Sequence, residues 1–189
     1  MIDINESRKI VAISNTGPLI SAFQCEKVDL LKLYFSLVYI TVTELVELQK
    51  HGWSDEIQRL INDRFIVVIE QFTDHEKEEA IRLSKKIAKE PSSGDKNWHS
   101  HIPEAEAMTL MLKRMYLRIE IILLDEKSAR NIAQEMKLSF TGFPGLLAKA
   151  GLDGLLTQND IRKLLKTCQQ HGTHYSDNLI ETTAKNYGR

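Results

Sequence analysis

The chain has 189 residues, of which 42% are hydrophobic and 27% charged, a composition typical of a soluble globular protein with one domain and at most a small appendage. The formal net charge of −1 excludes the strongly basic surface that is typical of many nucleic-acid-binding proteins. A local basic patch could still bind nucleic acid. No apolar run approaches the ~20 residues of a membrane helix and no secretory signal opens the chain, so we expect a cytoplasmic protein without membrane contact.

Five short apolar runs predict β-strands along the chain. Four of them are continuously apolar rather than alternating, as in strands that are buried on both faces of a parallel sheet. The polar cluster at residues 14–18 ends the first run and indicates a strand-to-helix turn. The predicted strands are residues 10–13, 37–40, 65–69, 121–124 and a brief one at 140–141.

Helical patterns separate these runs. Thr41 can cap a helix that runs from about Val42 into the fifties. Residues 91–101, rich in Ser, Gly, Asp and His, indicate a loop between two helices. Further helices are predicted at residues 19–23, 28–35, 74–89, before the fourth strand, from about 126 to 136, and at about 158–170 and 176–186.

Strands that alternate with helices predict βαβ units and a three-layer α/β/α fold with a parallel sheet. We assign residues 1–150 to this domain and residues 151–189 to a C-terminal helical extension packed on it. A separate domain is disfavoured there because about 40 residues rarely hold a core alone.

Polar residues follow the predicted strands at the positions where a parallel sheet forms its ligand crevice, beyond the carboxyl ends of the strands. Carboxylates that meet there repel one another and raise each other's pKa unless a cation joins them. Mg²⁺ or Mn²⁺ is the usual cation, because both take oxygen ligands and can activate water against a phosphate. The candidates are Asn15, Glu47, Glu106 and Asp125, with Glu44, Glu104 and Glu126 beside them.

Five strings in a fixed order resemble PIN-domain proteins and cover about residues 10–150. They are ISNTGPLI (13–20), YI with EL (39–40 and 47–48), PEAEAM (103–108), LLDEKSAR (123–130) and TGFPGLL (141–147). The helical tail is also similar to a subgroup related to the VapC-type toxins of prokaryotes.

The resemblance implies a strand order of 3-2-1-4-5 and a metal-dependent endoribonuclease that uses Mg²⁺ or Mn²⁺. It also implies RNA as substrate, an antitoxin protein as partner in a toxin–antitoxin pair, and a homodimer. It assigns catalytic and metal-binding roles to Asn15, Glu47, Glu106 and Asp125, and substrate-orienting hydroxyls to Thr16 and Thr141.

Asn15 departs from the family pattern, in which an active nuclease normally has Asp at this position. An amide oxygen can coordinate a metal but carries no charge. A second hypothesis is therefore an attenuated PIN fold that binds RNA or protein. A third, an enzyme acting on a small molecule, is disfavoured because no Gly-X-Gly-X-X-Gly follows the first strand.

Two further groups of residues are interpreted as structural. We expect His99 and His101 to be solvated loop residues, since two histidines at this spacing are weak evidence for a metal. Cys25 and Cys168 match no zinc spacing and are expected to be reduced packing residues.

Overall fold

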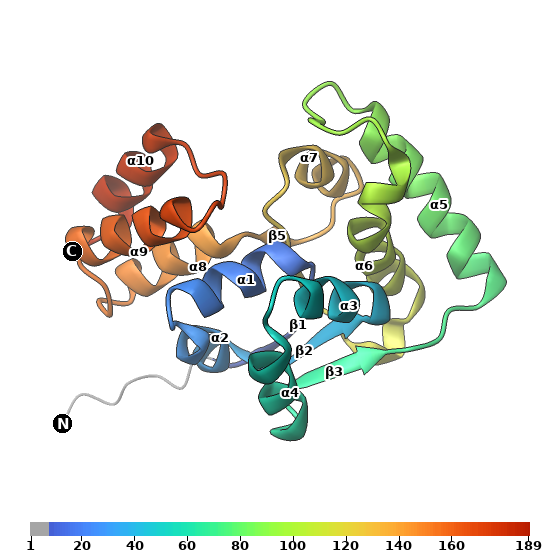
Figure 1. Cartoon of the computed structure of the whole chain (residues 1–189), viewed down its shortest axis with the longest axis horizontal. Helices are drawn as coiled ribbons and strands as arrows, with labels where there is room; N and C mark the ends of the chain where they lie inside the picture. Colours follow the sequence, from blue (N-terminus) through green and yellow to red (C-terminus); the bar gives the residue numbers. More distant parts are fainter. Residues whose placement is uncertain (1–7) are drawn as a thin grey trace.

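The computed structural model describes residues 8–189, which form a five-stranded sheet with helices on both faces (Figure 1). All neighbouring strands are parallel, and their order is β3-β2-β1-β4-β5. The predicted three-layer fold and the strand order implied by the resemblance are confirmed. The strands are β1 (Ile10–Ser14), β2 (Phe35–Thr41), β3 (Ile66–Ile69), β4 (Ile121–Leu123) and β5 (Phe140–Thr141).

The helices connect the strands and then continue as a C-terminal group. They are α1 (Thr16–Gln24), α2 (Val28–Tyr34), α3 (Val42–Lys50), α4 (Ser54–Asn62), α5 (Asp74–Lys89), α6 (Ile102–Lys113), α7 (Lys127–Glu135), α8 (Phe143–Leu152), α9 (Gln158–Gln170) and α10 (Asp177–Tyr187), with 3₁₀ turns at Trp98–His101 and Met115–Leu117. None of the helices in residues 8–189 combines the length and apolarity that a membrane crossing requires.

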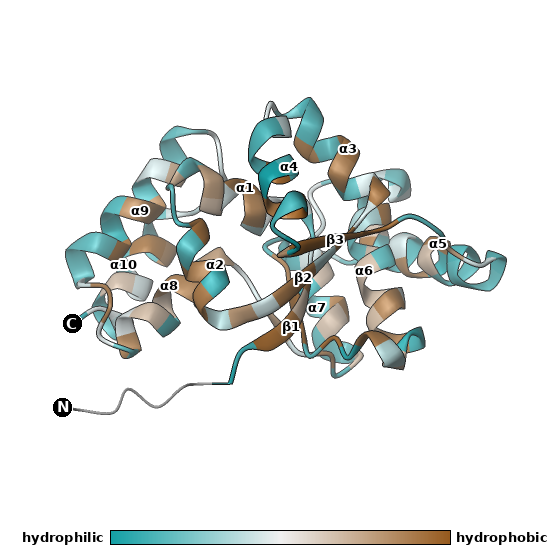
Figure 2. Cartoon of the chain, turned by 90° about the horizontal axis from the view of Figure 1, so that it is seen from below, coloured by the Kyte–Doolittle hydropathy of each residue, from teal (hydrophilic) through white to brown (hydrophobic). Residues whose placement is uncertain are grey.

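The sheet separates two apolar cores because successive side chains of a strand point to opposite faces. In β1, Ala12 packs with α1, α2 and the C-terminal helices, whereas Ile13 packs with α5, α6 and α7. In β4, Leu123 belongs to the first core and Ile122 to the second. Figure 2 shows the strands as an apolar layer between these groups of helices. The strands are thus buried on both faces, as their continuous apolarity predicts.

Two expected boundaries are wrong in detail. The helix predicted from Val42 into the fifties is two helices, because the chain turns at Gly52 with a φ of 86°, a left-handed conformation that favours glycine. Phe35, which the periodicity places at the end of a helix, is instead the first residue of β2 and is buried in the first core. Helix α8 follows β5 directly and was not predicted.

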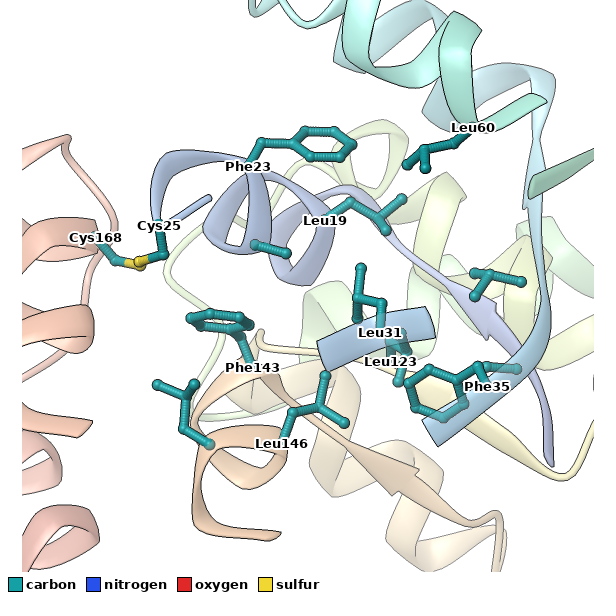
Figure 3. Packing of buried hydrophobic residues seen from close by; sticks show 14 of the residues in the cluster. Leu19, Phe23, Cys25, Leu31, Phe35, Leu60, Leu123, Phe143, Leu146 and Cys168 are labelled. Carbon is teal, nitrogen blue, oxygen red and sulfur yellow. The ribbon is translucent and has the colours of Figure 1, made fainter. Parts of the chain in front are cut away.

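The C-terminal helices complete the first core. Phe143 of α8 and Leu165 of α9 are fully buried in the same cluster as Leu19 of α1. Figure 3 shows Cys25, at the end of α1, facing Cys168 of α9. The two buried thiols are free and their Sγ atoms lie 3.1 Å apart, and the expectation that both residues pack in the core is confirmed. The domain boundary at residue 150 stays a prediction.

Candidate metal centre at the carboxyl edge of the sheet

Asn15 and Glu104 form the centre of a polar cluster where β1 ends. Asn15 follows β1, and its backbone N–H donates to the carbonyl of Leu123 in the neighbouring strand at 3.0 Å. Its side-chain Nδ2 donates to Glu104 Oε1 at 2.8 Å. Pro103 stands in the first turn of α6 and pre-sets the helical φ there, so Glu104 enters the crevice from the start of that helix. Both side chains are 7% exposed.

Asn15 and Glu104 each have a buried side-chain oxygen without a hydrogen-bond partner. Among residues 8–189, the buried side-chain oxygens without a hydrogen-bond partner are Asn15 Oδ1, Glu44 Oε1 and Glu104 Oε2. Such groups are rare in folded proteins, because an unsatisfied buried oxygen costs roughly 1–3 kcal/mol. The bonded pair of Asn15 and Glu104 leaves one free acceptor on each partner. An oxygen-binding cation would satisfy both.

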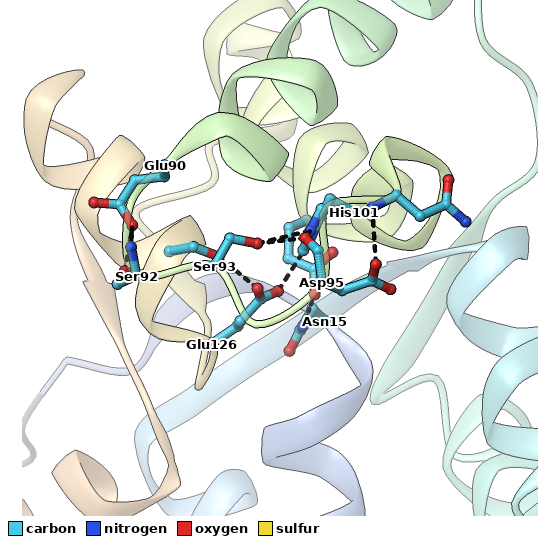
Figure 4. Close-up of polar contacts among 10 residues, drawn as sticks. Asn15, Glu90, Ser92, Ser93, Asp95, His101 and Glu126 are labelled. Carbon is cyan, nitrogen blue, oxygen red and sulfur yellow. Dashed lines mark hydrogen bonds and ion pairs between the residues drawn. The ribbon is translucent and has the colours of Figure 1, made fainter.

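His101 and Glu126 adjoin the pair from the other side. Figure 4 shows the two side chains pointing toward one another, and His101 Nδ1 lies 3.2 Å from Glu126 Oε2. His101 Nε2 lies 2.8 Å from the carbonyl oxygen of Asp95, which can only accept a hydrogen bond, so Nε2 carries a proton. His101, Glu104 and Glu126 each offer one ligand atom, and these three atoms lie within 4.8 Å of one another. The expectation that His101 is a solvated loop residue is wrong, since it is 2% exposed.

Asp125 follows β4 and is held from both sides. Its Oδ1 accepts a hydrogen bond from the backbone N–H of Phe143 at 3.0 Å, and its Oδ2 accepts one from the Tyr175 hydroxyl at 2.8 Å. Gly142 lies so close to Asp125 that an added Cβ would collide with Oδ1. A Cβ at Gly17 would lie 3.7 Å from both Asp125 Oδ2 and Asn15 Oδ1. Asp125 and Asn15 therefore border the same small space.

The two glutamates assigned by the family resemblance lie at the flank of this cluster. Glu47 is half-exposed, and its Oε2 accepts a hydrogen bond from Thr16 Oγ1 at 2.6 Å. Glu106 Oε2 accepts one from Thr41 Oγ1 at 2.7 Å. Glu106 stands two residues after Glu104, about 200° around the helix, so the two side chains leave α6 in different directions. Their roles stay predictions, as do those of Thr16 and of Thr141, whose hydroxyl donates weakly to the Gly142 carbonyl at 3.4 Å.

In the absence of a cation, burial raises the pKa values of several acids of the cluster. Burial raises the pKa of Glu104 to about 7, and the Glu126 carboxylate adds to the rise. Burial likewise raises the pKa of Asp125 to about 6, against the opposing hydrogen bonds of Tyr175 and Phe143. Burial also raises the pKa of Glu44 well above its usual range, with nearby Glu106 and Glu104 contributing. Groups with pKa values shifted in this way are concentrated at functional sites.

The pKa of His101 is raised as well, but by its neighbours and not by burial. Burial disfavours its charged form, but the Asp95 carbonyl and the Glu126 and Glu104 carboxylates outweigh burial and raise the pKa of His101. A positive charge is therefore favoured at the point where the carboxylates converge. A bound cation would likewise place positive charge next to these carboxylates and stabilise their ionised forms.

Sequence patterns missed three members of this site. The sequence pattern puts Glu104 beside the candidate residues; Pro103, typical of the first turn of a helix, is the signal that places Glu104 at the helix start. His101 and His99 alone are weak evidence for a metal, and the contact of His101 with Glu126 joins residues 25 apart in the sequence, which spacing does not reveal. Tyr175 reaches Asp125 from 50 residues away, and no local pattern marks it.

The donor set fits a hard divalent cation. One ligand atom each of His101, Glu104 and Glu126 lies within 4.8 Å of the others. Asn15 and Glu104 each keep a buried oxygen without a partner, and Asp125 borders Asn15. Comparison with known families points the same way: a family model described as a PIN domain matches residues 11–189. The chain belongs to the PIN-domain family. No curated protein and no solved structure matches it. The PIN domain is a nuclease-type fold, and the acidic cluster of this PIN domain is placed to bind metal.

Proposed function

We propose that this PIN domain is a divalent-metal-dependent endoribonuclease that hydrolyses RNA phosphodiester bonds. The observation that carries the proposal is the pair of unpartnered oxygens on Asn15 and Glu104, set among the carboxylates of Asp125 and Glu126. A buried arrangement of this kind is costly for a protein unless a cation uses it.

Glu104, Asp125 and Asn15 would hold the cation, with Glu126 and His101 at its side. When bound there, a divalent cation would supply Lewis-acid chemistry: a lower pKa for a water molecule and positive charge next to the phosphate. The chain itself orients the acids. Asn15 Nδ2 fixes Glu104, the Tyr175 hydroxyl and the Phe143 amide fix Asp125, and Thr16 fixes Glu47 at the flank.

Mn²⁺ is the preferred cation of the two that the family resemblance implies. His101 Nδ1 places an imidazole nitrogen beside the carboxylates. Nitrogen donors favour Mn²⁺ over Mg²⁺, which demands oxygen ligands and gives up water reluctantly. We therefore expect activity with both ions and tighter binding of Mn²⁺.

The finer assignment rests on the resemblance of the sequence strings. We propose a VapC-related toxin, neutralised by an antitoxin protein and acting as a homodimer. Light scattering of the purified chain tests the dimer, and co-expression with the product of a neighbouring small gene tests the antitoxin.

The test of the proposed activity is incubation of the purified protein with a mixed RNA pool and Mn²⁺. Wild-type protein is expected to cleave the pool, and Glu104→Gln is expected to lose at least about a hundredfold in rate, as when one electrostatic stabiliser of a transition state is removed. Glu78→Gln, an exposed glutamate of α5, is the matched control and should retain the wild-type rate. Equal rates for wild type and Glu104→Gln would refute the assignment.

The amide at position 15 favours one alternative. A site with Asn in place of Asp has one negative charge fewer, which suits an attenuated PIN fold that binds RNA or protein without cutting it. RNA binding without cleavage, in protein that shows no Mn²⁺ binding, would support this alternative.

A further inference from the structure

A cleft opens beside Asp125 and Glu126, between α7 on one side and α10 with its preceding loop on the other. Its volume is about 920 Å³, and its lining includes Lys127, Arg130, Phe140 and Tyr187. We call it the α7–α10 cleft. It begins at two acids of the metal centre and leads away from them, so a chain bound at the metal centre can continue into it.

Two cations of α7 face this cleft. Lys127 and Arg130 stand three residues apart, a spacing that puts them on one side of the helix. Both are exposed, and within the part of the chain that the structure describes neither forms an ion pair with a carboxylate. Arg130 also lies close enough to Asp125 for its charge to lower the pKa of that carboxyl. Phosphates next to the scissile one would find unpaired positive charge here.

Aromatic rings line the same cleft. The Arg130 guanidinium lies over the Phe140 ring, 5.5 Å from its centroid, and Tyr187 of α10 is 40% exposed at the opposite wall. Nucleobases stack on aromatic rings and on guanidinium planes, but only when they are free of their own helical stack. Rings and cations together suit a single strand better than a duplex, whose bases are already stacked.

We propose that the α7–α10 cleft binds a short stretch of single-stranded RNA adjoining the scissile phosphate. Lys127 and Arg130 contact its phosphates, and Phe140 with Arg130 receives a base. This inference rests on the proposed function, because it makes the cleft a continuation of the nuclease site.

The experiment measures binding and cleavage separately on the full chain. Fluorescence anisotropy with a labelled single-stranded RNA oligonucleotide in EDTA reports binding, and Mn²⁺ is then added to measure the cleavage rate. The double variant Lys127→Ala/Arg130→Ala is expected to bind at least about tenfold more weakly. The slope of log affinity against log salt concentration should become shallower by about 1.4, since each lost phosphate contact on a single strand contributes about 0.7.

The matched control removes two cations from another hollow of the surface. Lys27 and Lys163 line a depression of about 380 Å³ between α1 and α9, so Lys27→Ala/Lys163→Ala loses the same charge elsewhere. It is expected to bind and cleave within about twofold of wild type. Phe140→Leu tests stacking: it should weaken binding of the normal oligonucleotide and leave binding of an abasic oligonucleotide unchanged.

Several outcomes would overturn the inference. They are unchanged binding by the Lys127/Arg130 variant, an equal loss in the Lys27/Lys163 control, equal affinity for duplex RNA, and binding of a mononucleotide as tight as that of the oligonucleotide. Its failure is distinct from failure of the proposed function. Wild-type protein that binds through the cleft but cleaves nothing in Mn²⁺ would support the cleft and refute the nuclease.

Discussion

At position 15 an amide nitrogen stands where an aspartate would have a second carboxylate oxygen, and this changes both the hydrogen bonding and the charge of the site. The Asn15 amide nitrogen donates to Glu104 at 2.8 Å, which an aspartate at the same position could not do. The amide thus joins two buried groups in the metal-free protein, whereas a second carboxylate would repel Glu104. The cost is one negative charge fewer for the cation. We therefore expect Asn15 to lower the affinity for metal and to stabilise the metal-free protein.

Asn15→Asp tests this trade. We expect the variant to bind Mn²⁺ about tenfold more tightly, because it adds a charged oxygen ligand. Without metal, its Tm should fall by several degrees, since about 1 kcal/mol corresponds to roughly 2–4 °C in a domain of this size. Calorimetric titration and thermal unfolding measure the two effects. Unchanged affinity together with an unchanged Tm would show that position 15 does not face the cation.

The choice between Glu104 and Glu106 marks the limit of sequence reasoning at this scale. The spacing and the family strings indicate helix α6 and both of its glutamates. They do not decide which of the two side chains points into the crevice. Which of the two enters the crevice depends on the rotational phase of the helix against β1. The start of the helix at Ile102 sets this phase, and boundaries are the least certain part of a sequence-based assignment.

The loop between α9 and α10 brings a residue of the C-terminal tail to the candidate metal centre. Tyr175 is buried there; its hydroxyl donates to Asp125 Oδ2 at 2.8 Å and lies 2.9 Å from Ser21 Oγ of α1. The tail thus positions a carboxylate of the site in addition to completing a core.

Tyr175→Phe is expected to raise the pKa of Asp125 above its value of about 6, because the hydroxyl stabilises the ionised form. Near pH 6 to 7 the variant should bind Mn²⁺ more weakly than wild type, and the difference should vanish at higher pH as Asp125 ionises. Calorimetric titration across this range measures it. Tyr34→Phe is the matched control, since Tyr34 donates to Asp153 on the surface at 2.9 Å. Equal pH profiles for wild type and Tyr175→Phe would contradict the role.

The sequence predicted the tail helices but not what they contact. Amphipathic periodicity located α9 and α10 within one or two residues. The partners of tail residues lie far away in the chain: Cys25 is 143 residues from Cys168 in α9, and Asp125 is 50 residues from Tyr175 in the loop. Local patterns carry no information about such distant pairs.

The molecule gathers several acids at the carboxyl edge of its sheet, so we expect its stability to depend on pH and on metal. In the folded chain the pKa values of Glu104 and Asp125 are about 7 and about 6, above their ordinary values. A carboxyl whose folded pKa is raised stabilises the fold while protonated, and this contribution is lost as pH rises through the folded pKa. The raised pKa of His101 acts in the same direction.

We therefore expect the Tm of metal-free protein to fall by roughly 4 °C or more between about pH 5 and pH 8. The low pKa of Glu76, about 2, means that its ion pair with Arg114 is fully formed throughout this range and does not contribute to the fall. Saturating Mn²⁺ should raise the Tm more at pH 8 than at pH 5, because binding requires the ionised acids. Thermal unfolding with and without Mn²⁺ checks both statements. An equal Mn²⁺ effect at both pH values would contradict them.

The central claim is that Glu104 and Asn15, with Asp125, form one cation site at the edge of the sheet. Calorimetric titration of Mn²⁺ into wild type, Glu104→Gln and Glu106→Gln near pH 7.5 tests it most directly. We predict one bound ion per chain in wild type, a loss of at least about tenfold in affinity for Glu104→Gln, and a smaller loss for Glu106→Gln. Wild-type affinity in Glu104→Gln, or no Mn²⁺ binding by the wild-type chain, would contradict the claim.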